Sequence, residues 1–368
     1  MMKRLLLVGG GHAHALVLLG LIRQPIKNVE IIVISPVGLV PYSGMIPGWL
    51  AGQYKFEDTV IDFVALCNRA GARWVEAELT SLQPDCNIIT LSTGEQFTYD
   101  WLSINIGSTL RPPELKTAAI LAMRPLWTLQ ERYPQLLEVW SHEPSQSTLN
   151  VTAVGAGAAG VESLLCILHR LRQLRPDRVV NGYLTTRASG VLPGFNATAQ
   201  RYALQSLHQA GVTIQAETAG LIDSKTVNDL IIWATGAQAH GWQLDPDRHG
   251  NLQVSKDGFI QIDEMLRSLS HSNVFAVGDC AQLPETLPKA GVFAVRMATT
   301  LEINLRHVLV ALPLERFKVQ RVALALLNTA DGKAIATRSR WAFRGRWAWV
   351  WKDYIDRKFI HHFRSGNI

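Results

Sequence analysis

The sequence predicts a mixed α/β fold of two similar units followed by a C-terminal extension. A strand, a glycine-rich turn and a helix occur at the N-terminus and again 146 residues later. The chain has 368 residues, 48% of them apolar, which is enough for two or three domains with filled cores. From residue 313 onward the composition changes, because aromatic and basic residues accumulate there.

The first unit begins with the strand KRLLLV, a turn of three glycines and a helix starting near His12. The eighteen uncharged residues from Leu5 to Ile22 have the length of a signal peptide or a short membrane span, but the glycines divide them. Such a turn lets the backbone approach a pyrophosphate, which the positive end of the helix attracts. Gly9-x-Gly11 fits this pattern, but His14 stands where a third glycine is usual. On its own, this motif is equally compatible with a buried strand and turn that bind no nucleotide.

A second copy resolves this ambiguity. Gly155, Gly157 and Gly160 have the full G-x-G-x-x-G spacing, directly after an apolar strand and before a helical pattern. Two such loops in the same context predict that the chain binds two dinucleotides.

Further elements follow in order. We expect a second strand EIIVIS, a Pro/Gly-rich loop PVGLVPYSGMIPGWLAGQY, a helix with several short alternating strands, and a linker with another helix. After the second glycine loop come the strands NGYLTT and DLIIW, a helix ending in QSLHQ between them, and a final meander.

The cysteines and histidines predict neither disulfides nor a metal site. The four cysteines lie far apart, which favours thiols in a reducing, cytoplasmic compartment. Two pairs of histidines are close in sequence, His12/His14 and His361/His362, but neither has further ligands at a spacing that suits a metal, so no metal is expected.

Five motifs together resemble the two-dinucleotide-binding flavoproteins of the pyridine nucleotide-disulfide oxidoreductase superfamily. They are the first glycine loop, NIGS at 105–108, the second glycine loop, WATGA at 233–237 and VFAVGDCA at 274–281. The resemblance covers residues 1 to about 310. It implies two Rossmann-like domains: an FAD domain in two segments, 1–115 and 245–312, and an NAD(P)H domain inserted at 116–244. Residues 313–368 form the extension.

The resemblance assigns residues to both cofactors. Gly9 and Gly11 would approach the FAD pyrophosphate, and Asp279 would accept a hydrogen bond from the ribityl chain, with a strand-end turn cap as its alternative role. Glu162 matches an acidic position that relatives place near the nicotinamide, with an ordinary first-turn glutamate as the alternative. The FAD set is Gly9, Gly11, His12, Ser35, Pro41, Gly107, Asp279, Ala290, Gly291 and Val292. The NAD(P)H set is Gly155, Gly157, Gly160, Glu162, Arg187 and Gly236. No catalytic side chain is assigned, since hydride transfer itself needs no acid or base.

Within the superfamily, the chain lacks the C-x₄-C pair of the disulfide reductases. It resembles the type II NADH dehydrogenase and sulfide:quinone reductase branch, in which LPKAGVFAVRMA would start a helix beneath the flavin. Sulfide oxidation needs cysteines beside the flavin, and none matches, so NAD(P)H to a quinone or similar acceptor is the leading reaction. GGGHAHALVL and the tail also resemble a subgroup found fused N-terminal to selenophosphate synthetase. That likeness leaves open a flavin module that serves a protein partner in selenium metabolism.

Two departures concern the nucleotides. Ser35-Pro36 stands where relatives have an acid for the adenosine ribose of FAD, so a hydroxyl, a backbone group or water must hold it. Thr185-Thr186-Arg187 replaces the corresponding acid in the second unit, and an arginine attracts a 2′-phosphate. NADH and NADPH therefore both remain candidates.

The basic character of the chain belongs to its tail. Residues 313–368 hold twelve Lys/Arg against four Asp/Glu, while the whole chain is only +6. An aromatic and apolar stripe recurs every four residues there, with the charged residues expected elsewhere on the helix: Trp347, Trp351, Ile355, Phe359 and Phe363. Peripheral membrane contact through 341–363, on the inner face of the membrane, is one interpretation, and docking on the FAD domain or a homodimer face is the other. The tail contains no nucleic-acid reading module.

Overall fold

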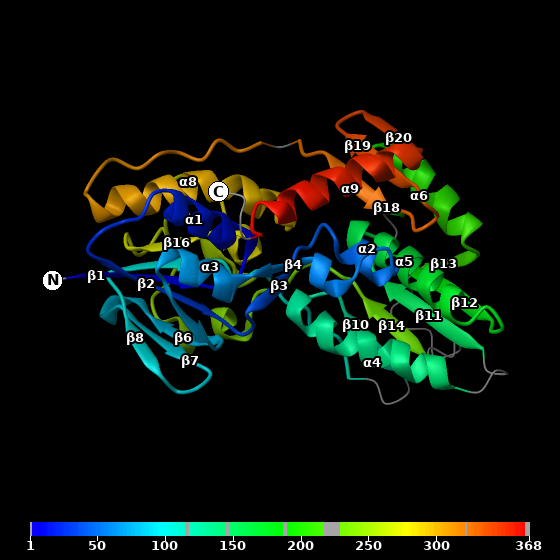
Figure 1. Ribbon diagram of the computed structural model, residues 1–368, viewed down its shortest axis with the longest axis horizontal. Helices are drawn as coiled ribbons and strands as arrows, with labels where there is room; N and C mark the ends of the chain where they lie inside the picture. Colours follow the sequence, from blue (N-terminus) through cyan, green and yellow to red (C-terminus); the bar gives the residue numbers. More distant parts are fainter. Residues whose placement is uncertain are drawn as a thin grey trace.

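The computed structural model describes residues 2–114, 118–143, 148–186, 190–216, 229–320 and 322–364. Two lobes lie side by side, each with a parallel sheet at its centre, and the last helix runs along the top between them (Figure 1). The predicted α/β class is confirmed.

The first lobe is built on a five-stranded parallel sheet in the order β16-β9-β1-β2-β5. Its strands are Lys3–Val8 (β1), Val29–Ser35 (β2), Arg73–Glu76 (β5), Trp101–Ile104 (β9) and Val274–Ala276 (β16). Helices His12–Arg23 (α1), Phe63–Ala70 (α3) and Gly291–Leu309 (α8) belong to the same lobe, and α1 packs on both others. The strands of the second sheet lie between β9 and β16 in the sequence, so two distant segments share one sheet.

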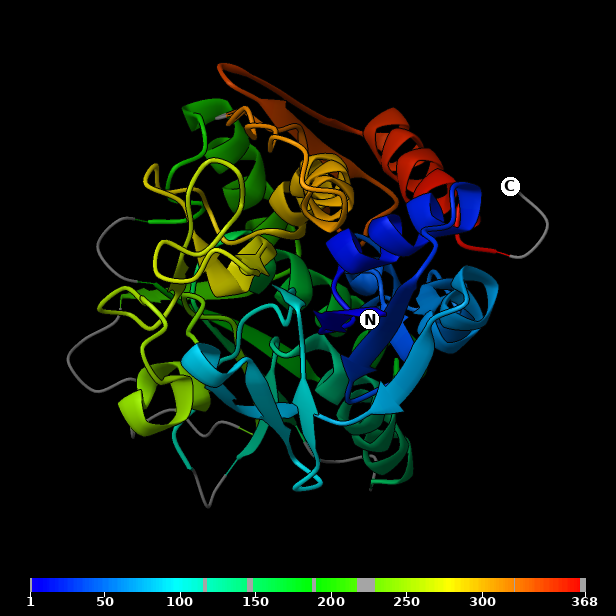
Figure 2. The ribbon, with the colours of Figure 1, turned by 90° about the vertical axis from the view of Figure 1, so that its left-hand side faces the viewer.

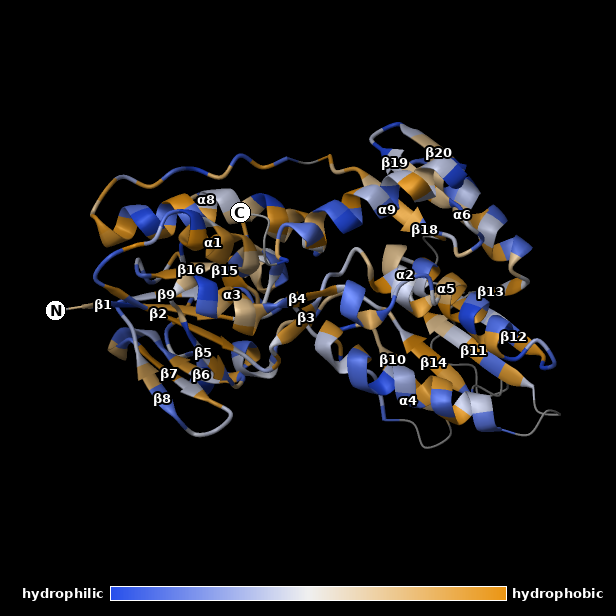
Figure 3. Cartoon of the chain, viewed as in Figure 1, coloured by the Kyte–Doolittle hydropathy of each residue, from blue (hydrophilic) through white to orange (hydrophobic). Residues whose placement is uncertain are grey.

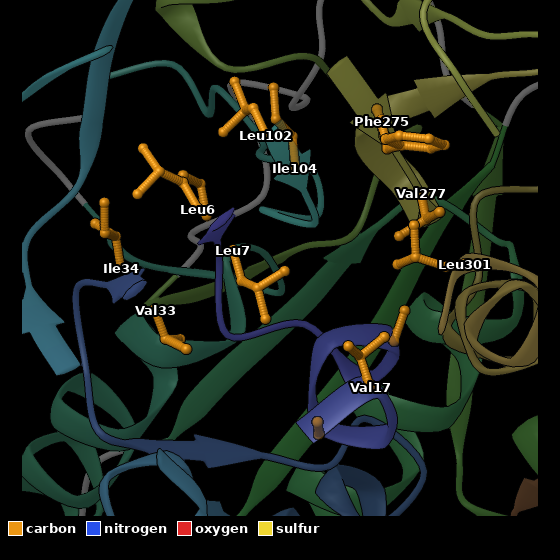
Figure 4. Close-up of a cluster of buried hydrophobic side chains, with 14 of the residues drawn as sticks. Leu6, Leu7, Val17, Val33, Ile34, Leu102, Ile104, Phe275, Val277 and Leu301 are labelled. Carbon is orange, nitrogen blue, oxygen red and sulfur yellow. The ribbon is translucent and has the colours of Figure 1, made fainter. Parts of the chain in front are cut away.

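The core of this lobe forms where β1 is covered on both sides. Leu6 and Leu7 point to opposite faces of the sheet, as alternation along a strand requires, and both are fully buried. Figure 4 shows Val17 of α1 and Leu301 of α8 near this group of side chains. The two helices and the neighbouring strands β2 and β9 thus hold β1, and with it the glycine turn that follows.

The second lobe repeats the design with the order β10-β14-β11-β12-β13, again all parallel. Its strands are Ala119–Ala122 (β10), Leu149–Val154 (β11), Val180–Thr186 (β12), Val212–Ala216 (β13) and Leu230–Trp233 (β14). Its helices are Leu129–His142 (α4), Ala158–Leu174 (α5) and Ala197–Gln209 (α6). Hydropathy colouring shows apolar strands inside and polar residues on the outward side of α4 (Figure 3). Both predicted strand–turn–helix units, β1–α1 and β11–α5, are confirmed.

Shorter elements complete the lobes. An antiparallel meander of three strands extends the first lobe. The predicted Pro/Gly-rich loop contains a short helix and a short strand, which pairs antiparallel with a strand that follows the loop. The strands are Leu79–Gln83 (β6), Ile88–Leu91 (β7), Gln96–Thr98 (β8), Leu39–Pro41 (β3), Val60–Asp62 (β4), Ile260–Gln261 (β15) and Ala281–Gln282 (β17). The short helices are Ile46–Leu50 (α2), Pro246–His249 (α7), and the 3₁₀ turns Phe56–Asp58, Pro84–Cys86, Leu126–Thr128, Gly241–Leu244 and Gly278–Cys280.

The C-terminal extension is not only helical. Three antiparallel strands, Ala325–Asn328 (β18), Ala334–Arg338 (β19) and Trp341–Gly345 (β20), precede helix Arg346–His361 (α9). The strands lie against α6 of the second lobe, and α9 reaches back to the first lobe (Figures 1 and 2). None of the helices in the described ranges combines the length and apolarity needed to cross a membrane.

The exposed and buried sides of α9 differ from the expected stripe. Lys352 and Asp356 are buried, whereas Trp347 is 61% exposed. The sequence pattern placed the charged residues away from the aromatic stripe, but it did not predict that two of them are buried. They are tolerated inside because they bind each other and because Lys352 Nζ also donates to the carbonyl of Gly44, at 2.5 Å.

Candidate cofactor site

A cavity of about 300 Å³ opens at the carboxyl ends of β1, β2 and β9, the edge where parallel α/β sheets bind ligands. Eight of the ten residues predicted for FAD line it, and the exceptions, Ala290 and Val292, flank Gly291, which does. Glu162, predicted for the nicotinamide site, lines the same cavity. The lining members of the FAD set are Gly9, Gly11, His12, Ser35, Pro41, Gly107, Asp279 and Gly291.

The first glycine loop is held against the end of β9 by Asn105. Its side-chain Oδ1 accepts from the backbone N–H of Ala13 at 3.2 Å, and its Nδ2 donates to the carbonyl of Val277 at 2.9 Å. A Cβ atom on Gly11 would lie 2.0 Å from Asn105 Oδ1, and Gly9 has a φ of +103°. Both positions therefore require glycine, for close approach and for backbone conformation respectively.

His14 takes the place of the third glycine and braces the loop. Its Nδ1 bonds to the carbonyl of Gly9 at 2.8 Å and its Nε2 to Ser103 Oγ at 2.8 Å. Complete burial lowers the pKa of His14 to about 4, so the ring is neutral at physiological pH. The substitution that weakened the sequence motif is thus a structural support of the same loop.

Three helices begin at the cavity wall. His12 starts α1, Gly291 starts α8, and Ala159 in the first turn of α5 also lines the cavity. The first N–H groups of a helix have no partner within the helix, and its dipole makes that end positive. Burial lowers the pKa of His12 to about 4, and its Nε2 accepts from the backbone N–H of Ser43 at 3.3 Å. The wall therefore offers N–H donors and positive dipole ends, which suit an anionic ligand.

Glu162 joins the cavity to a buried cluster that the sequence did not predict. Its Oε1 accepts from the backbone N–H of Asn328 at 2.6 Å. Burial raises the pKa of Glu162 to about 7, an effect that the positive charge of Lys352 partly offsets. Burial also opposes the charge on Lys352, but the negative charges of Asp356 and Glu162 outweigh it and raise the pKa of Lys352. The cavity wall therefore contains a carboxyl group that gains and loses a proton near neutral pH.

Asp279 forms an ion pair with an arginine that sequence reasoning also missed. Arg124 follows β10 of the second lobe, lines the cavity, and donates to Asp279 Oδ2 and to Ser108 Oγ. Its other terminal nitrogen donates to the carbonyl of Lys289 at 2.8 Å. The available signal was a single arginine between apolar residues in the linker, which has no distinctive spacing.

The end of β2 has a serine where the superfamily pattern has an acidic residue. Ser35 lines the cavity, and so does Glu78, two residues after the end of the neighbouring strand β5. A hydroxyl and a carboxylate therefore line the cavity at the edge of the sheet where the acid is missing.

The second glycine loop has the geometry that its spacing predicts. Gly155 has a φ of +108°, and a Cβ on Gly160 would lie 1.8 Å from the carbonyl oxygen of Gly155. Gly157, the N-cap of α5, and Gly236 have open space where a Cβ would be. These two positions leave room for a ligand to approach the backbone. Arg187 lies outside the described residues.

The cysteines play no part in the cavity lining. All four are free thiols, and three of them are buried. Burial raises the pKa of Cys280 to about 11, and the negative charge of the adjacent Asp279 acts in the same direction. The described residues contain no cluster of His, Cys, Asp and Glu that could hold a metal.

Comparison with known proteins agrees with this geometry. Residues 3–294 match the family described as "Pyridine nucleotide-disulphide oxidoreductase". The chain belongs to this family. It is 23% identical to the "Alternative NAD(P)H-ubiquinone oxidoreductase C1, chloroplastic/mitochondrial" of Arabidopsis thaliana, over 87% of the chain and 70% of that protein. It is 26% identical to the "Sulfide-quinone reductase" of Aquifex aeolicus, over 100% of the chain and 93% of that protein.

Solved structures show the same fold. The sulfide:quinone oxidoreductase of Aquifex aeolicus matches with a TM-score of 0.78 at 16% identity, covering 100% of this chain and 92% of that one. NDH2 from Plasmodium falciparum in complex with NADH matches with a TM-score of 0.76 at 14% identity, covering 99% and 97%. The predicted superfamily and branch are confirmed, while the narrower likeness to a selenophosphate synthetase module stays a prediction.

Proposed function

We propose that the protein is an FAD-dependent NAD(P)H oxidoreductase that passes electrons to a quinone. The observation that carries the proposal is the convergence, on one cavity, of the first glycine loop, the start of α8 and Glu162 from the helix of the second glycine loop. The similarity to NAD(P)H–ubiquinone and type II NADH:quinone oxidoreductases supports the donor and the acceptor. The lack of a cysteine in the cavity lining favours quinone reduction without a thiol step.

The residues present fit FAD. Gly9 and Gly11 bring backbone N–H groups of the α1 N-terminus to the cavity, where they would hold the pyrophosphate. Asp279 would accept from the ribityl chain, and the start of α8 at Gly291 would face the flavin ring. When bound, FAD supplies the ring that accepts hydride from a reduced nicotinamide and releases electrons to an acceptor.

The second nucleotide would bind to the loop at residues 155–160. Gly157 and Gly236 leave open space there, and the N-terminus of α5 provides the positive dipole end. Glu162, one turn into α5, would then reach the flavin cavity from the helix that binds this nucleotide. The domain boundaries at residues 115, 244 and 312 stay a prediction.

Glu162 is the group that would handle protons. Reduction of a quinone to a quinol adds two electrons and two protons. The hydride of NAD(P)H accounts for both electrons and one proton, so one further proton must be supplied. A cavity-lining carboxyl with a pKa of about 7 can hold a proton and release it at neutral pH. The buried ammonium of Lys352 beside it can compensate the negative charge left behind.

The visible spectrum of the purified protein tests the proposal. We expect a yellow protein whose flavin absorbance bleaches under anaerobic conditions with NADH or NADPH and returns on addition of a soluble quinone. Separate titrations with the two nucleotides identify the donor. A yellow protein that neither nucleotide bleaches would refute the oxidoreductase proposal, and bleaching without recovery in quinone would favour the partner-serving module.

We further propose that the extension docks on the membrane that contains the quinone. Four aromatic rings of β20 and α9 form a stack, with centroids 5.7, 4.0 and 6.3 Å apart in order: Trp341, Phe343, Trp347 and Trp351. Val350 and Tyr354 continue this surface and are 52% and 61% exposed. Arg338, Arg340 and Arg346 are exposed nearby in the chain. Exposed tryptophan with arginine suits the interface of an anionic bilayer.

Vesicle co-sedimentation tests the docking surface. We expect binding to vesicles that contain phosphatidylglycerol, weaker binding to phosphatidylcholine alone, and a loss of binding in the W347S/Y354S variant. Leu204→Ser is the matched control, because Leu204 is 44% exposed but lies on α6. Equal binding by the double variant, or a dimer that dissociates in that variant, would contradict the membrane assignment.

A further inference from the structure

Among the described residues, the hydrogen bonds to the Asp279 carboxylate all reach one of its two oxygens. Arg124 and Ser108 both donate to Oδ2, the latter at 3.4 Å. Within the described part of the chain, no hydrogen bond reaches Oδ1. The side chain is 15% exposed, and this residue lines the cavity. One oxygen is therefore fixed while the other remains available to a donor from a ligand.

Arg124 connects the second lobe to three segments of the first lobe. It lies just after β10, at the edge of the second sheet, yet its guanidinium reaches the loop after β9, the turn at 278–280 and the loop before α8. The planar fork of a guanidinium can bind these three acceptors at once, whereas an ammonium is a compact point charge on a flexible chain. Through the side chain of Arg124, the second lobe therefore holds the carboxylate of Asp279, which belongs to the first lobe.

The positive charge of Arg124 also compensates the negative charge of Asp279 at the cavity wall. A carboxylate near a diphosphate ligand would repel it, because both carry negative charge. Arg124 pairs with Asp279 at the wall, so the wall presents an acceptor oxygen without an added net negative charge. The neighbouring Lys289 directs its Nζ to the carbonyl of Ala281, at 2.5 Å, and among the described residues forms no ion pair with Asp279.

We propose that Arg124 is a positioning residue of the flavin site, which fixes Asp279 through Oδ2 so that Oδ1 receives a hydroxyl of the ribityl chain. This inference rests on the FAD assignment made above. It predicts that Arg124 and Asp279 act as one unit, so that removing either loses the same interaction. It also makes FAD retention depend on a residue that the nucleotide-binding lobe supplies.

The test is a double-mutant cycle on FAD affinity in the full-length chain. We would measure the FAD dissociation constant, from flavin fluorescence, for the wild type, R124Q, D279N and R124Q/D279N. Each single variant should bind FAD about 10- to 100-fold more weakly, as expected for loss of a charge-assisted hydrogen bond. The double variant should be no more than about 3-fold weaker than the weaker single variant, because the two residues act through one contact.

Two further variants separate positioning from folding. R124K keeps the positive charge but not the fork, and should bind FAD several-fold more weakly than wild type while unfolding at the same temperature without FAD. R111Q is the matched control: Arg111 is in the preceding loop and donates to the carbonyl of Ala239 at 3.2 Å, but does not line the cavity. Its FAD affinity should stay within about twofold of wild type.

An FAD analogue adds a readout that a purely structural role would not change. In the wild type, FAD that lacks the ribityl hydroxyl should bind more weakly than FAD. In R124Q and in D279N, the two ligands should bind with equal affinity. Multiplicative losses in the double variant, or R124K with unchanged affinity, would overturn the role of Arg124 while leaving the FAD assignment intact. An unaffected D279N would overturn the assignment of Asp279 and with it this inference. A wild type that does not bind FAD would overturn the proposed function itself.

Discussion

Replacing Glu162 with glutamine removes a proton-holding group from the cavity wall while keeping its contact with the chain. An amide oxygen can still accept from the backbone N–H of Asn328, which now bonds to Oε1 at 2.6 Å. A carboxyl with a pKa of about 7 is about 90% protonated one pH unit below that value and about 10% protonated one unit above it. If it supplies the proton to the quinone, the rate of that step should fall about tenfold per pH unit above about 7.

The assay separates the two half-reactions. Flavin is first reduced anaerobically with one equivalent of nucleotide, and its reoxidation by a short-chain quinone is then followed by stopped flow across the neutral range. We expect E162Q to reoxidise about 100-fold more slowly at mildly acidic pH, without the wild-type pH dependence. Reduction by the nucleotide should change little, because hydride transfer needs no acid or base.

The control is E131Q, which changes an exposed carboxyl on α4 and should match the wild type in both half-reactions. Reoxidation of E162Q with the wild-type pH profile would refute the role of Glu162 in proton supply. A loss confined to reduction by the nucleotide would instead assign Glu162 to the nicotinamide side.

Three other perturbations follow from the same structure. K352M should shift the pH profile of quinone reduction to higher pH, since the charge of the lysine lowers the pKa of Glu162; the kinetics of flavin reoxidation measure this shift. The same variant leaves the buried carboxylate of Asp356 without its ion pair, so it should lower the free energy of unfolding by about 3 kcal/mol, which urea unfolding measures. Below about pH 6.5 the unfolded chain protonates His14 while the folded chain keeps it neutral, so the free energy of unfolding is unaffected above that pH and falls by about 3 kcal/mol as the pH drops to about 4. Urea unfolding of wild type and H14Q across this range would detect the difference. G160A places a Cβ 1.8 Å from a backbone carbonyl and should abolish bleaching by NAD(P)H while FAD content stays normal, whereas G241A, which has open space, should behave as wild type.

Short-range sequence patterns were sufficient to predict the two nucleotide-binding units. An apolar strand, glycines at fixed spacing and an amphipathic helix all lie within about 25 residues, and each has a local physical cause. The same reasoning predicted β2, β12 and β14, because buried parallel strands consist of nearly continuous apolar runs. Most of the cavity lining followed, since the glycine loop, the end of β2 and Asp279 occupy the carboxyl edge of one sheet.

The contacts made over long distances in the sequence could not be predicted in this way. Lys352 and Asp356 have the spacing of an exposed ion pair on a helix surface, and only the packing of α9 on Gly44 and Glu162 buries them. Arg124 reaches Asp279 across 155 residues, and no pattern in the linker marks it. His14 looked like a defect in a motif because its partners, the Gly9 carbonyl and Ser103, become neighbours only when β9 pairs with β1.

Helix α9 relates the docking surface to the cavity. Trp347 and Tyr354 lie on its exposed side, and Lys352 lies on the opposite, buried side, as the helical period requires. Toward its C-terminal end, Phe359 stacks on Tyr42 with ring centroids 4.3 Å apart, and Tyr42 in turn lies 5.3 Å from the ring of His12 at the cavity wall. A single rigid element thus contacts the proposed membrane surface on one side and the proton-holding cluster on the other. If docking positions this helix, vesicles should accelerate flavin reoxidation by a lipophilic quinone and leave reduction by NAD(P)H unchanged, and W347S/Y354S should lose only the acceleration. An equal effect of vesicles on both half-reactions would indicate that lipid acts on the protein as a whole and not through this helix.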